Sequence, residues 1–405
     1  MKKPPRICLT LTSAAVTGLL ALSATAQEAP QDGVYKDRID WGVQMDMSGP
    51  TAEAQSTWVK GFQDYMRKVN EAGGIGGRKI NVLAEDNKFN AAQDKIIYEK
   101  FVAQTPVLGI SGMGSSGGQV ALAPTIRAGK VPVVGTYTPT KALIEPASPL
   151  TYHGMCAYKP MAQTGVGYFT DTLKLKAPKV VTVSIESAGG KEYHDYVAEA
   201  VTKLGGTATL VTMKVTAVDV TPQALEIMNL KPDFIAIYGV NNTAVLTMKA
   251  LAQYGVKIPA FAITYLAQPQ IYAAMGAQAG ANYYVATCLS PGGSDDTPGN
   301  KELSAFADKA GRGAIKEDIN YAAGWIVGHM VGDRISQLGA NVTRARLVES
   351  MGKGFTADTG GLTAPINYST TDHGGPQVHK MISFDYATNK VKSHGGFKDF
   401  EKYIK

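Results

Sequence analysis

Hydrophobic residues recur along the chain in two alternating patterns. Short runs of consecutive apolar residues, such as 39–45 and 179–185, are typical of buried β-strands. Longer segments repeat apolar residues at spacings of three and four, which is typical of amphipathic helices. The helix expected over 51–71 places the following residues on one face: Trp58, Phe62, Tyr65, Met66 and Val69. Strands that alternate with helices in this way predict parallel sheets built from βαβ units.

The alternation runs through the chain in two series. The first predicts strands at 39–45, 79–84, 107–111 and 131–134 and helices at 51–71, 91–102 and 119–128. The second predicts strands at 179–185, 209–215, 233–238 and 260–263 and helices at 161–174, 193–204, 222–230 and 243–254. Further helices are expected near 301–310, 319–338 and 343–352. Two such series imply two similar α/β lobes, which suits a chain of 405 residues.

The N-terminus has the composition of a secretory signal peptide. Lys2, Lys3 and Arg6 precede an apolar stretch, and Ala24-Thr25-Ala26 fits the small-residue cleavage pattern. Residues 1–26 are therefore expected to be removed after Ala26, leaving a soluble protein in the bacterial periplasm. The formal net charge of +6 then falls by the three charges of that peptide, to +3. With so little charge and no dense Lys/Arg stripe, nucleic acid is not expected as a partner.

The segment 109–124, GISGMGSSGGQVALAP, satisfies two functional motifs at once. Gly112, Gly114 and Gly117 spell the dinucleotide fingerprint G-x-G-x-x-G. That fingerprint belongs to the first strand and needs an acidic residue about 20 positions on. Here it follows the third expected strand, and no Asp or Glu occurs between Glu99 and Glu145. A dinucleotide site is therefore not expected.

The same segment also matches the nucleophile elbow of serine hydrolases, G-x-S-x-G, with Ser116 as the nucleophile. That chemistry needs a later acid and a later His, and Asp318 with His329 or Asp358 with His373 follow in the required order. An exported serine hydrolase using Ser116 is therefore the rival hypothesis. No metal-binding motif such as H-E-x-x-H or C-x-x-C occurs, so neither a metal nor a cofactor is expected.

A third interpretation of the segment is a binding site at which no reaction takes place. A helix N-terminus offers unpaired N–H groups and a positive dipole end, so it can hold a carboxylate. In open α/β sheets, ligands bind outside the carboxyl ends of the strands. Three turns rich in Ser and Thr should converge there: 47–49, 114–116 and 135–138.

The chain resembles the periplasmic leucine/isoleucine/valine-binding protein family, the solute receptors of ABC importers. The marks of the resemblance are the segments 47–50 (MSGP) before a long helix, 70–77 (NEAGGIGG), the serine-rich 114–119 (GSSGGQ), 132–134 (PVV), 255–256 (GV) and 361–363 (GLT), with Phe384 near the end. The resemblance covers nearly all of the mature chain. It implies two Rossmann-like lobes with parallel central sheets, joined by a hinge of three crossings.

The resemblance also implies the division of the chain and the site. Residues 34–156 and 289–361 form the first lobe, and residues 157–288 and 362–405 form the second. Ser115 and the segment 136–138 are implied to bind a ligand carboxylate, and Tyr193 to cover the ligand. The full candidate ligand-binding set is Ser48, Ser115, Ser116, Thr136, Tyr137, Thr138, Tyr193, Asn241 and Tyr265.

One departure from the family bears on the ligand. Amino-acid-binding members place an acidic residue after the strand equivalent to 260–263, where it pairs with the ligand ammonium, but this chain continues Thr264-Tyr265-Leu266. Because a buried ammonium without a counter-charge is costly, an aromatic or aliphatic carboxylate is favoured over an amino acid. A branched-chain amino acid stays the alternative ligand.

The resemblance places two cysteines in the hinge. Two crossings are expected at 153–157 and 286–289, which brings Cys156 and Cys288 side by side. A bridge between them needs Cα atoms roughly 4.4–6.8 Å apart. The expected protein is a monomeric, non-enzymatic receptor that closes on its ligand and presents it to an ABC permease in the inner membrane.

Overall fold

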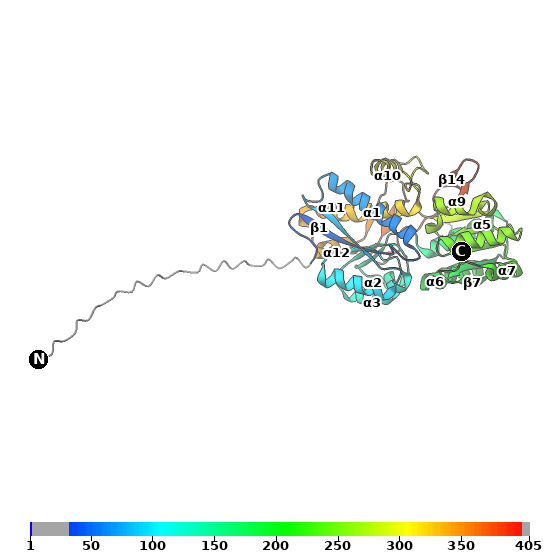
Figure 1. The fold of residues 1–405 in the computed structure, drawn as a ribbon, viewed down its shortest axis with the longest axis horizontal. Coiled ribbons are helices and arrows are strands. Elements are labelled where there is room, and N and C mark those ends of the chain that lie inside the picture. Colours follow the sequence, from blue (N-terminus) through cyan, green and yellow to red (C-terminus); the bar gives the residue numbers. More distant parts are fainter. Residues whose placement is uncertain (2–31, 399–405) are drawn as a thin grey trace.

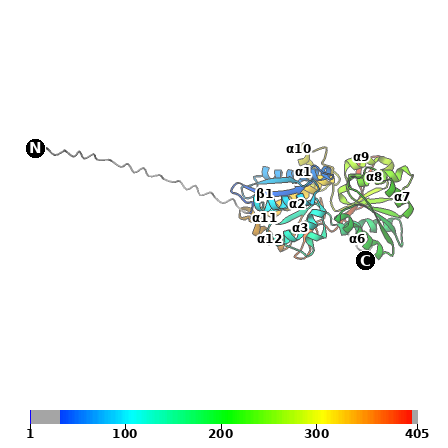
Figure 2. The same cartoon turned by 60° about the horizontal axis from the view of Figure 1, so that its bottom comes forward.

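The computed structural model describes residue 1 and residues 32–398. These residues form two α/β lobes that stand side by side (Figure 1) and remain distinct in the turned view of Figure 2. The signal peptide expected over residues 1–26 lies, apart from Met1, outside the described residues. None of the described helices is long and apolar enough to span a bilayer.

The first lobe is built on a five-stranded parallel sheet in the order β2-β1-β3-β4-β5. Its strands are β1 (Arg38–Met45), β2 (Lys79–Asp86), β3 (Ile110–Gly112), β4 (Val133–Thr136) and β5 (Thr151–His153). Its helices are α1 (Ala52–Glu71), α2 (Ala91–Glu99) with a π-helical extension η1 (Lys100–Gln104), α3 (Ser116–Ala128), α4 (Lys141–Ile144), α10 (Pro298–Lys309), α11 (Ile319–Leu338), η3 (Gly339–Asn341) and α12 (Arg344–Gly352). A short hairpin of β11 (Phe355–Ala357) and β12 (Ile366–Tyr368) accompanies them.

The second lobe is built on a seven-stranded sheet in the order β14-β13-β10-β9-β8-β6-β7. Its parallel strands are β6 (Lys179–Ile185), β7 (Thr207–Met213), β8 (Phe234–Tyr238), β9 (Ala260–Ala262) and β10 (Tyr283–Thr287). The antiparallel edge consists of β13 (Lys380–Asp385) and β14 (Lys390–Ser393). Its helices are α5 (Tyr158–Thr172), α6 (Ala188–Lys203), α7 (Thr221–Leu230), α8 (Asn241–Gln253), η2 (Thr264–Leu266) and α9 (Pro269–Gly280).

Helices α1 and α11 pack closely against each other in the first lobe (Figure 1). The expected apolar face of α1 is buried, including Trp58 and Phe62. Two glycines allow the close approach: a Cβ on Gly61 would lie 2.1 Å from the carbonyl oxygen of Tyr321, and one on Gly324 would lie 1.9 Å from that of Trp58. Because a backbone carbonyl cannot move away as a flexible side chain can, any larger residue at either position would push the helices apart.

The predicted α/β alternation is confirmed along both lobes. Strand β6 and helix α11 have the predicted bounds, and most other elements differ by a few residues. Helix α3 begins at Ser116, three residues earlier than expected, because the Ser115 side chain caps it. The elements that were not predicted include α4, β5, α9, β10, β11 and β14.

The chain passes between the lobes near residues 153–158, 287–291 and 368–380. Residues 362–405 were expected in the second lobe, but β12 pairs with β11, and the Tyr368 hydroxyl donates to the His153 carbonyl at the end of β5. The structure therefore keeps residues up to Tyr368 with the first lobe, and the third crossing follows it. The reason is the hairpin, whose aromatic residues pack on Tyr152 of β5.

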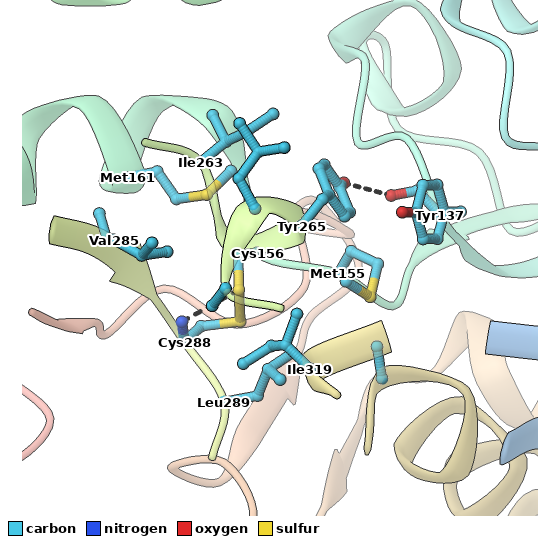
Figure 3. Close-up of a cluster of buried hydrophobic side chains, with 14 of the residues drawn as sticks. Tyr137, Met155, Cys156, Met161, Ile263, Tyr265, Val285, Cys288, Leu289 and Ile319 are labelled. Carbon is cyan, nitrogen blue, oxygen red and sulfur yellow. Dashed lines mark hydrogen bonds between the residues drawn. A yellow bond between two sulfur atoms is a disulfide. The ribbon is translucent and has the colours of Figure 1, made fainter. Parts of the chain in front are cut away.

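A disulfide joins the first two crossings. Cys156 and Cys288 are bonded, with Cα atoms 5.4 Å apart, and both are fully buried. Figure 3 shows the bridge between side chains of the second lobe, such as Met161 and Val285, and Ile319 of the first. The resemblance brought the two cysteines together without deciding whether they are bonded, and the structure shows the bond.

Candidate functional site

A cleft of about 350 Å³ lies between the two lobes, where the carboxyl ends of both parallel sheets face each other. The first lobe contributes residues that follow β1, β2, β3 and β4: Pro50, Thr51, Glu53, Ala54, Gln55, Phe89, Gly114, Tyr137 and Thr138. The second lobe contributes residues at or after the ends of β6, β7, β8 and β9: Ile185, Val215, Thr216, Tyr238, Gly239, Val240, Asn241, Asn242, Ile263, Tyr265, Leu266 and Gln268. Ligands of open α/β sheets bind at such strand ends.

The wall from the first lobe is held by its own hydrogen bonds. The Thr138 hydroxyl donates to the Gly114 carbonyl at 3.0 Å, which ties the turn after β4 to the turn after β3. The Gln55 side chain donates to the same carbonyl at 3.1 Å and accepts the Asp46 N–H at 2.7 Å. These bonds connect three turns and do not involve the second lobe, so they fix this wall by themselves.

The wall from the second lobe reaches across to the first. The Tyr265 hydroxyl donates to the carbonyl of Tyr137, and the two rings lie 4.4 Å apart between centroids (Figure 3). The Asn241 side-chain amide donates to the Glu53 carboxylate at 2.7 Å. Because these bonds join the two lobes, the structure represents a closed arrangement of the cleft.

The cleft lining includes four aromatic residues and carries little charge. Tyr137, Tyr238 and Tyr265 contribute aromatic surface, and burial raises the pKa of each phenol, to about 12 for Tyr238, so all three are neutral at neutral pH. Among the described residues that line it, Glu53 supplies the one carboxylate, and none is Lys, Arg or His. A bound anion would therefore be held by neutral donors and helix N–H groups.

A buried carboxylate lies behind this cleft. Asp318 caps α11 by accepting the Asn320 N–H, and it also accepts from Gln270 of the second lobe at 3.1 Å. Burial raises the pKa of Asp318 to about 6, against the opposing effect of these hydrogen bonds. Gln270 in turn donates to Gln268, a residue that lines the cleft.

Of the candidate ligand-binding residues, Tyr137, Thr138, Asn241 and Tyr265 line the cleft. They come from both lobes and lie after the ends of β4, β8 and β9. Their part in binding a ligand stays a prediction.

The remaining candidates are elsewhere in the structure. Ser115 is 5% exposed and accepts the Gly118 N–H at 3.1 Å as the cap of α3, and Ser116 is buried beside Tyr238. Thr136 is fully buried at the end of β4.

Two candidates lie away from the cleft lining. Ser48 is exposed and donates to the Asp86 carboxylate. Tyr193 was expected to cover the ligand, but it is fully buried in the second lobe against Tyr158 and Tyr238. The ring of Tyr193 packs within 6.1 Å of the Tyr158 ring and 5.7 Å of the Tyr238 ring, between centroids, in the core of that lobe.

Sequence reasoning missed several residues that line the cleft. Glu53 and Gln55 belong to the first turn of α1. Polar residues are usual in such a position, so their residue types did not indicate a binding site. Tyr238 ends a strand that was predicted correctly, so the strand-end rule could have found it.

The geometry around Ser116 does not favour a hydrolase. The sequence has six His, all within the described residues, and none of them hydrogen-bonds Ser116. His329 pairs with Asp333 at 3.1 Å and His373 contacts the Thr151 carbonyl, so neither proposed acid–histidine pair forms. The base that would activate the serine is not in place among residues 32–398.

A sequence model described as a periplasmic binding protein matches residues 39–388 of the chain. Among curated proteins, none matches the chain by sequence. The matched region includes most of both lobes and all residues that line the cleft.

Solved structures of similar fold cover almost the whole chain. A fatty acid ABC transporter substrate-binding protein from Thermomonospora curvata is 22% identical, with a TM-score of 0.83, over 93% of this chain and 97% of its own. A branched-chain amino acid ABC transporter protein from Thermus thermophilus with bound valine is 18% identical, with a TM-score of 0.82, over 91% and 99%. A solute-binding protein from R. palustris in complex with benzoate is 19% identical, with a TM-score of 0.75, over 89% and 96%. These likenesses establish the fold.

Proposed function

Because the chain belongs to the periplasmic binding protein family, we propose that it captures a small organic carboxylate in the interlobe cleft and delivers it to an ABC importer. The observation that carries the proposal is the cleft itself, which is lined at the carboxyl ends of both sheets by residues of both lobes. A ligand there contacts both walls only when the lobes are closed, so its binding shifts the population toward the closed form. No chemical step is part of the proposal.

The ligand class rests on two considerations. The three similar structures are named for a fatty acid, valine and benzoate, and each of these compounds carries a carboxylate. In this chain the N–H groups at the start of α3, which follows the cleft residue Gly114, are donors suited to that group. The tyrosines of the cleft suit an aromatic or aliphatic body.

An α-amino acid is the second ligand class, and one observation favours it. Sequence reasoning found no counter-charge for an ammonium after β9, but Glu53 lies in the cleft lining and accepts from the Asn241 amide. An ammonium could replace that amide as the partner of Glu53. The ligand screen below therefore includes amino acids.

A thermal-shift screen tests the function. Aromatic carboxylates, aliphatic carboxylates and amino acids are each added in excess to the mature protein, and the true ligand class raises the melting temperature by mass action. A large shift with benzoate-like or aliphatic acids supports the proposal. A large shift with leucine or valine and none with organic acids contradicts the preferred ligand class, and no shift with any of these compounds contradicts the proposed function.

Two further points concern the cellular location and the oligomeric state of the protein. We place the mature chain in the periplasm after cleavage behind Ala26, as a monomer that a membrane permease recognises in its closed form. N-terminal sequencing of the exported protein and size-exclusion chromatography with light scattering test these two points.

A further inference from the structure

Each of the three crossings between the lobes contributes one residue to a buried cluster at the hinge. Cys156 belongs to the first crossing, Cys288 to the second and His379 to the third, and all three are fully buried. The two sulfur atoms and a ring nitrogen of His379 all lie within 4.8 Å of one another. None of the three residues lines the main cleft, so this cluster is separate from the proposed ligand site.

The strand pairing explains why Cys288 and His379 are neighbours. Strands β10 and β13 are antiparallel and place Thr287 opposite Lys380. Cys288 follows Thr287 and His379 precedes Lys380, so both residues lie at the same end of the strand pair. Cys156 lies against this end, where the backbone N–H of Cys288 donates to its sulfur at 3.0 Å (Figure 3). The backbone of the hinge therefore sets the positions of all three residues.

His379 has one ring nitrogen without a partner. Its Nδ1 lies 3.2 Å from the Gln377 carbonyl, and because a carbonyl only accepts, Nδ1 carries the hydrogen. Nε2 then has a free lone pair, and within residues 32–398 no donor reaches it. A buried acceptor without a donor is costly, so its presence needs a reason. Metal-binding histidines share this arrangement, since they donate one ring N–H to a carbonyl and offer the other nitrogen to the ion.

We propose that the dithiol form of the hinge binds one Zn²⁺ ion through Cys156 Sγ, Cys288 Sγ and His379 Nε2. Two thiolates and one imidazole, with the fourth position open, are a ligand set that zinc adopts in proteins. A dithiol reductant opens the bridge: it supplies two electrons and two protons, two Cys thiols form, and the reductant becomes a disulfide. Zn²⁺ then displaces the two thiol protons, because only the thiolates bind the ion.

The cluster has nearly the dimensions of a zinc site. Zn–S and Zn–N bonds of about 2.3 and 2.1 Å place tetrahedral ligand atoms about 3.6–3.8 Å apart. The His379 nitrogen is already within 4.8 Å of both sulfur atoms, and reduction lets the sulfur atoms separate. An exported chain that has not yet been oxidised carries the same two thiols and needs no reductant. In that chain the ion joins all three crossings, whereas the bridge joins two.

The first experiment compares the two oxidation states of the mature protein. The bridge is reduced with a dithiol, the reductant is removed without oxygen, and Zn²⁺ binding is measured by competition with a chromophoric chelator. Zn²⁺ is added to the folded protein and also during refolding from urea, so that slow entry does not hide a buried site. The reduced protein is expected to bind one ion per chain that the oxidised protein does not bind. Equal binding by both forms, or no binding by the reduced form, would overturn the proposal.

The second experiment tests the histidine. His379→Asn keeps a donor near the place of Nδ1 and removes Nε2, so the reduced variant should bind Zn²⁺ at least about tenfold more weakly, since even the loss of a partner behind a ligand costs that much. His394→Asn is the matched control, because His394 is a half-buried histidine of the same lobe outside the cluster, and it should leave binding unchanged. Equal affinity in the two variants would overturn the role of His379. The melting temperature of oxidised His379→Asn, which keeps the bridge, shows that the variant folds.

Two measurements on the reduced wild type need no histidine variant. Co²⁺ in place of Zn²⁺ should give a thiolate-to-metal charge-transfer band and the strong visible absorption of a tetrahedral site. Zn²⁺ should also raise the melting temperature of the reduced wild type, because it binds the folded state, and leave that of Cys156→Ser/Cys288→Ser unchanged. The weak visible absorption of six-coordinate cobalt, or the same thermal shift in the double variant, would contradict the site.

Discussion

The two walls of the main cleft are held in different ways. On the first lobe, Thr138 and Gln55 are bonded to Gly114 within that lobe, so the wall exists without the second lobe. On the second lobe, Gln268 is bonded to both Asn241 and Tyr265, but the Tyr265 hydroxyl and the Asn241 amide also bond across the cleft, and these two bonds exist only when the lobes are closed. The bonds that the second wall makes across the cleft therefore report closure, and those within the first wall do not.

The hinge disulfide gives the largest expected effect. The double variant Cys156→Ser/Cys288→Ser should lose about 2–5 kcal/mol of unfolding free energy, because the bridge closes a long loop across 132 residues. Urea denaturation measures the loss. Neither cysteine lines the cleft, so the ligand should still raise the melting temperature of the variant.

A reducing agent provides the control for this prediction. It should destabilise the wild type and leave the double variant unchanged. Mass spectrometry of non-reduced peptides from the wild type tests the bridge directly, and two free thiols there would contradict it.

Asp318 lies where the two walls meet, since it belongs to α11 and accepts from Gln270 of the second lobe. Its pKa in the folded protein, about 6, is above the usual value of 3.8. Between these values the folded state binds more protons than the unfolded state, so the contribution of Asp318 to stability falls as pH rises from about 4 to 6. The unfolding free energy of Asp318→Asn minus that of the wild type should therefore be up to about 3 kcal/mol higher at pH 7 than at pH 4.

Urea denaturation of the wild type and the variant at both pH values gives this difference. Asp296→Asn is the control, because the Asp296 side chain is 87% exposed and its removal should give a difference near zero. A stability difference between Asp318→Asn and wild type that is constant from pH 4 to pH 7 would contradict the raised pKa.

Ser115 tests whether the turn before α3 takes part in ligand binding. As the cap of α3, its side chain should stabilise the ligand-free protein by about 0.5–2 kcal/mol, and Ser115→Ala should also weaken ligand binding by about 1–3 kcal/mol if this turn holds the carboxylate. Thr343→Ala removes the equivalent cap of α12, outside the cleft, and should lower stability alone. Calorimetric titration with the ligand found by the screen separates the two effects. Unchanged affinity in Ser115→Ala would remove this serine from the binding site.

The fold was predictable because burial on both faces of a parallel sheet leaves plain apolar runs between amphipathic helices. Helix α9 escaped prediction, since its Ala- and Gly-rich segment has weak periodicity and a non-helical residue at Gly276. The turns at the cleft were predictable from strand ends alone. The direction of each side chain was not, so Thr136 and Tyr193 proved buried and Glu53 was overlooked: these outcomes depend on packing between segments far apart in the sequence.

The smallest expected effect is the loss of a single hydroxyl group. Removing one hydroxyl from each wall compares the two walls directly. Tyr265→Phe removes only the bond across the cleft, so it should weaken ligand binding by about 0.5–1.5 kcal/mol with little change in the stability of the first lobe. Tyr137→Phe removes a bond to Asn320 at 2.8 Å within the first lobe, so it should lower the stability of the ligand-free protein. Denaturation and calorimetric titration of both variants distinguish the walls. If the two variants changed stability and affinity alike, the walls would not differ, because the first would depend on closure as much as the second does.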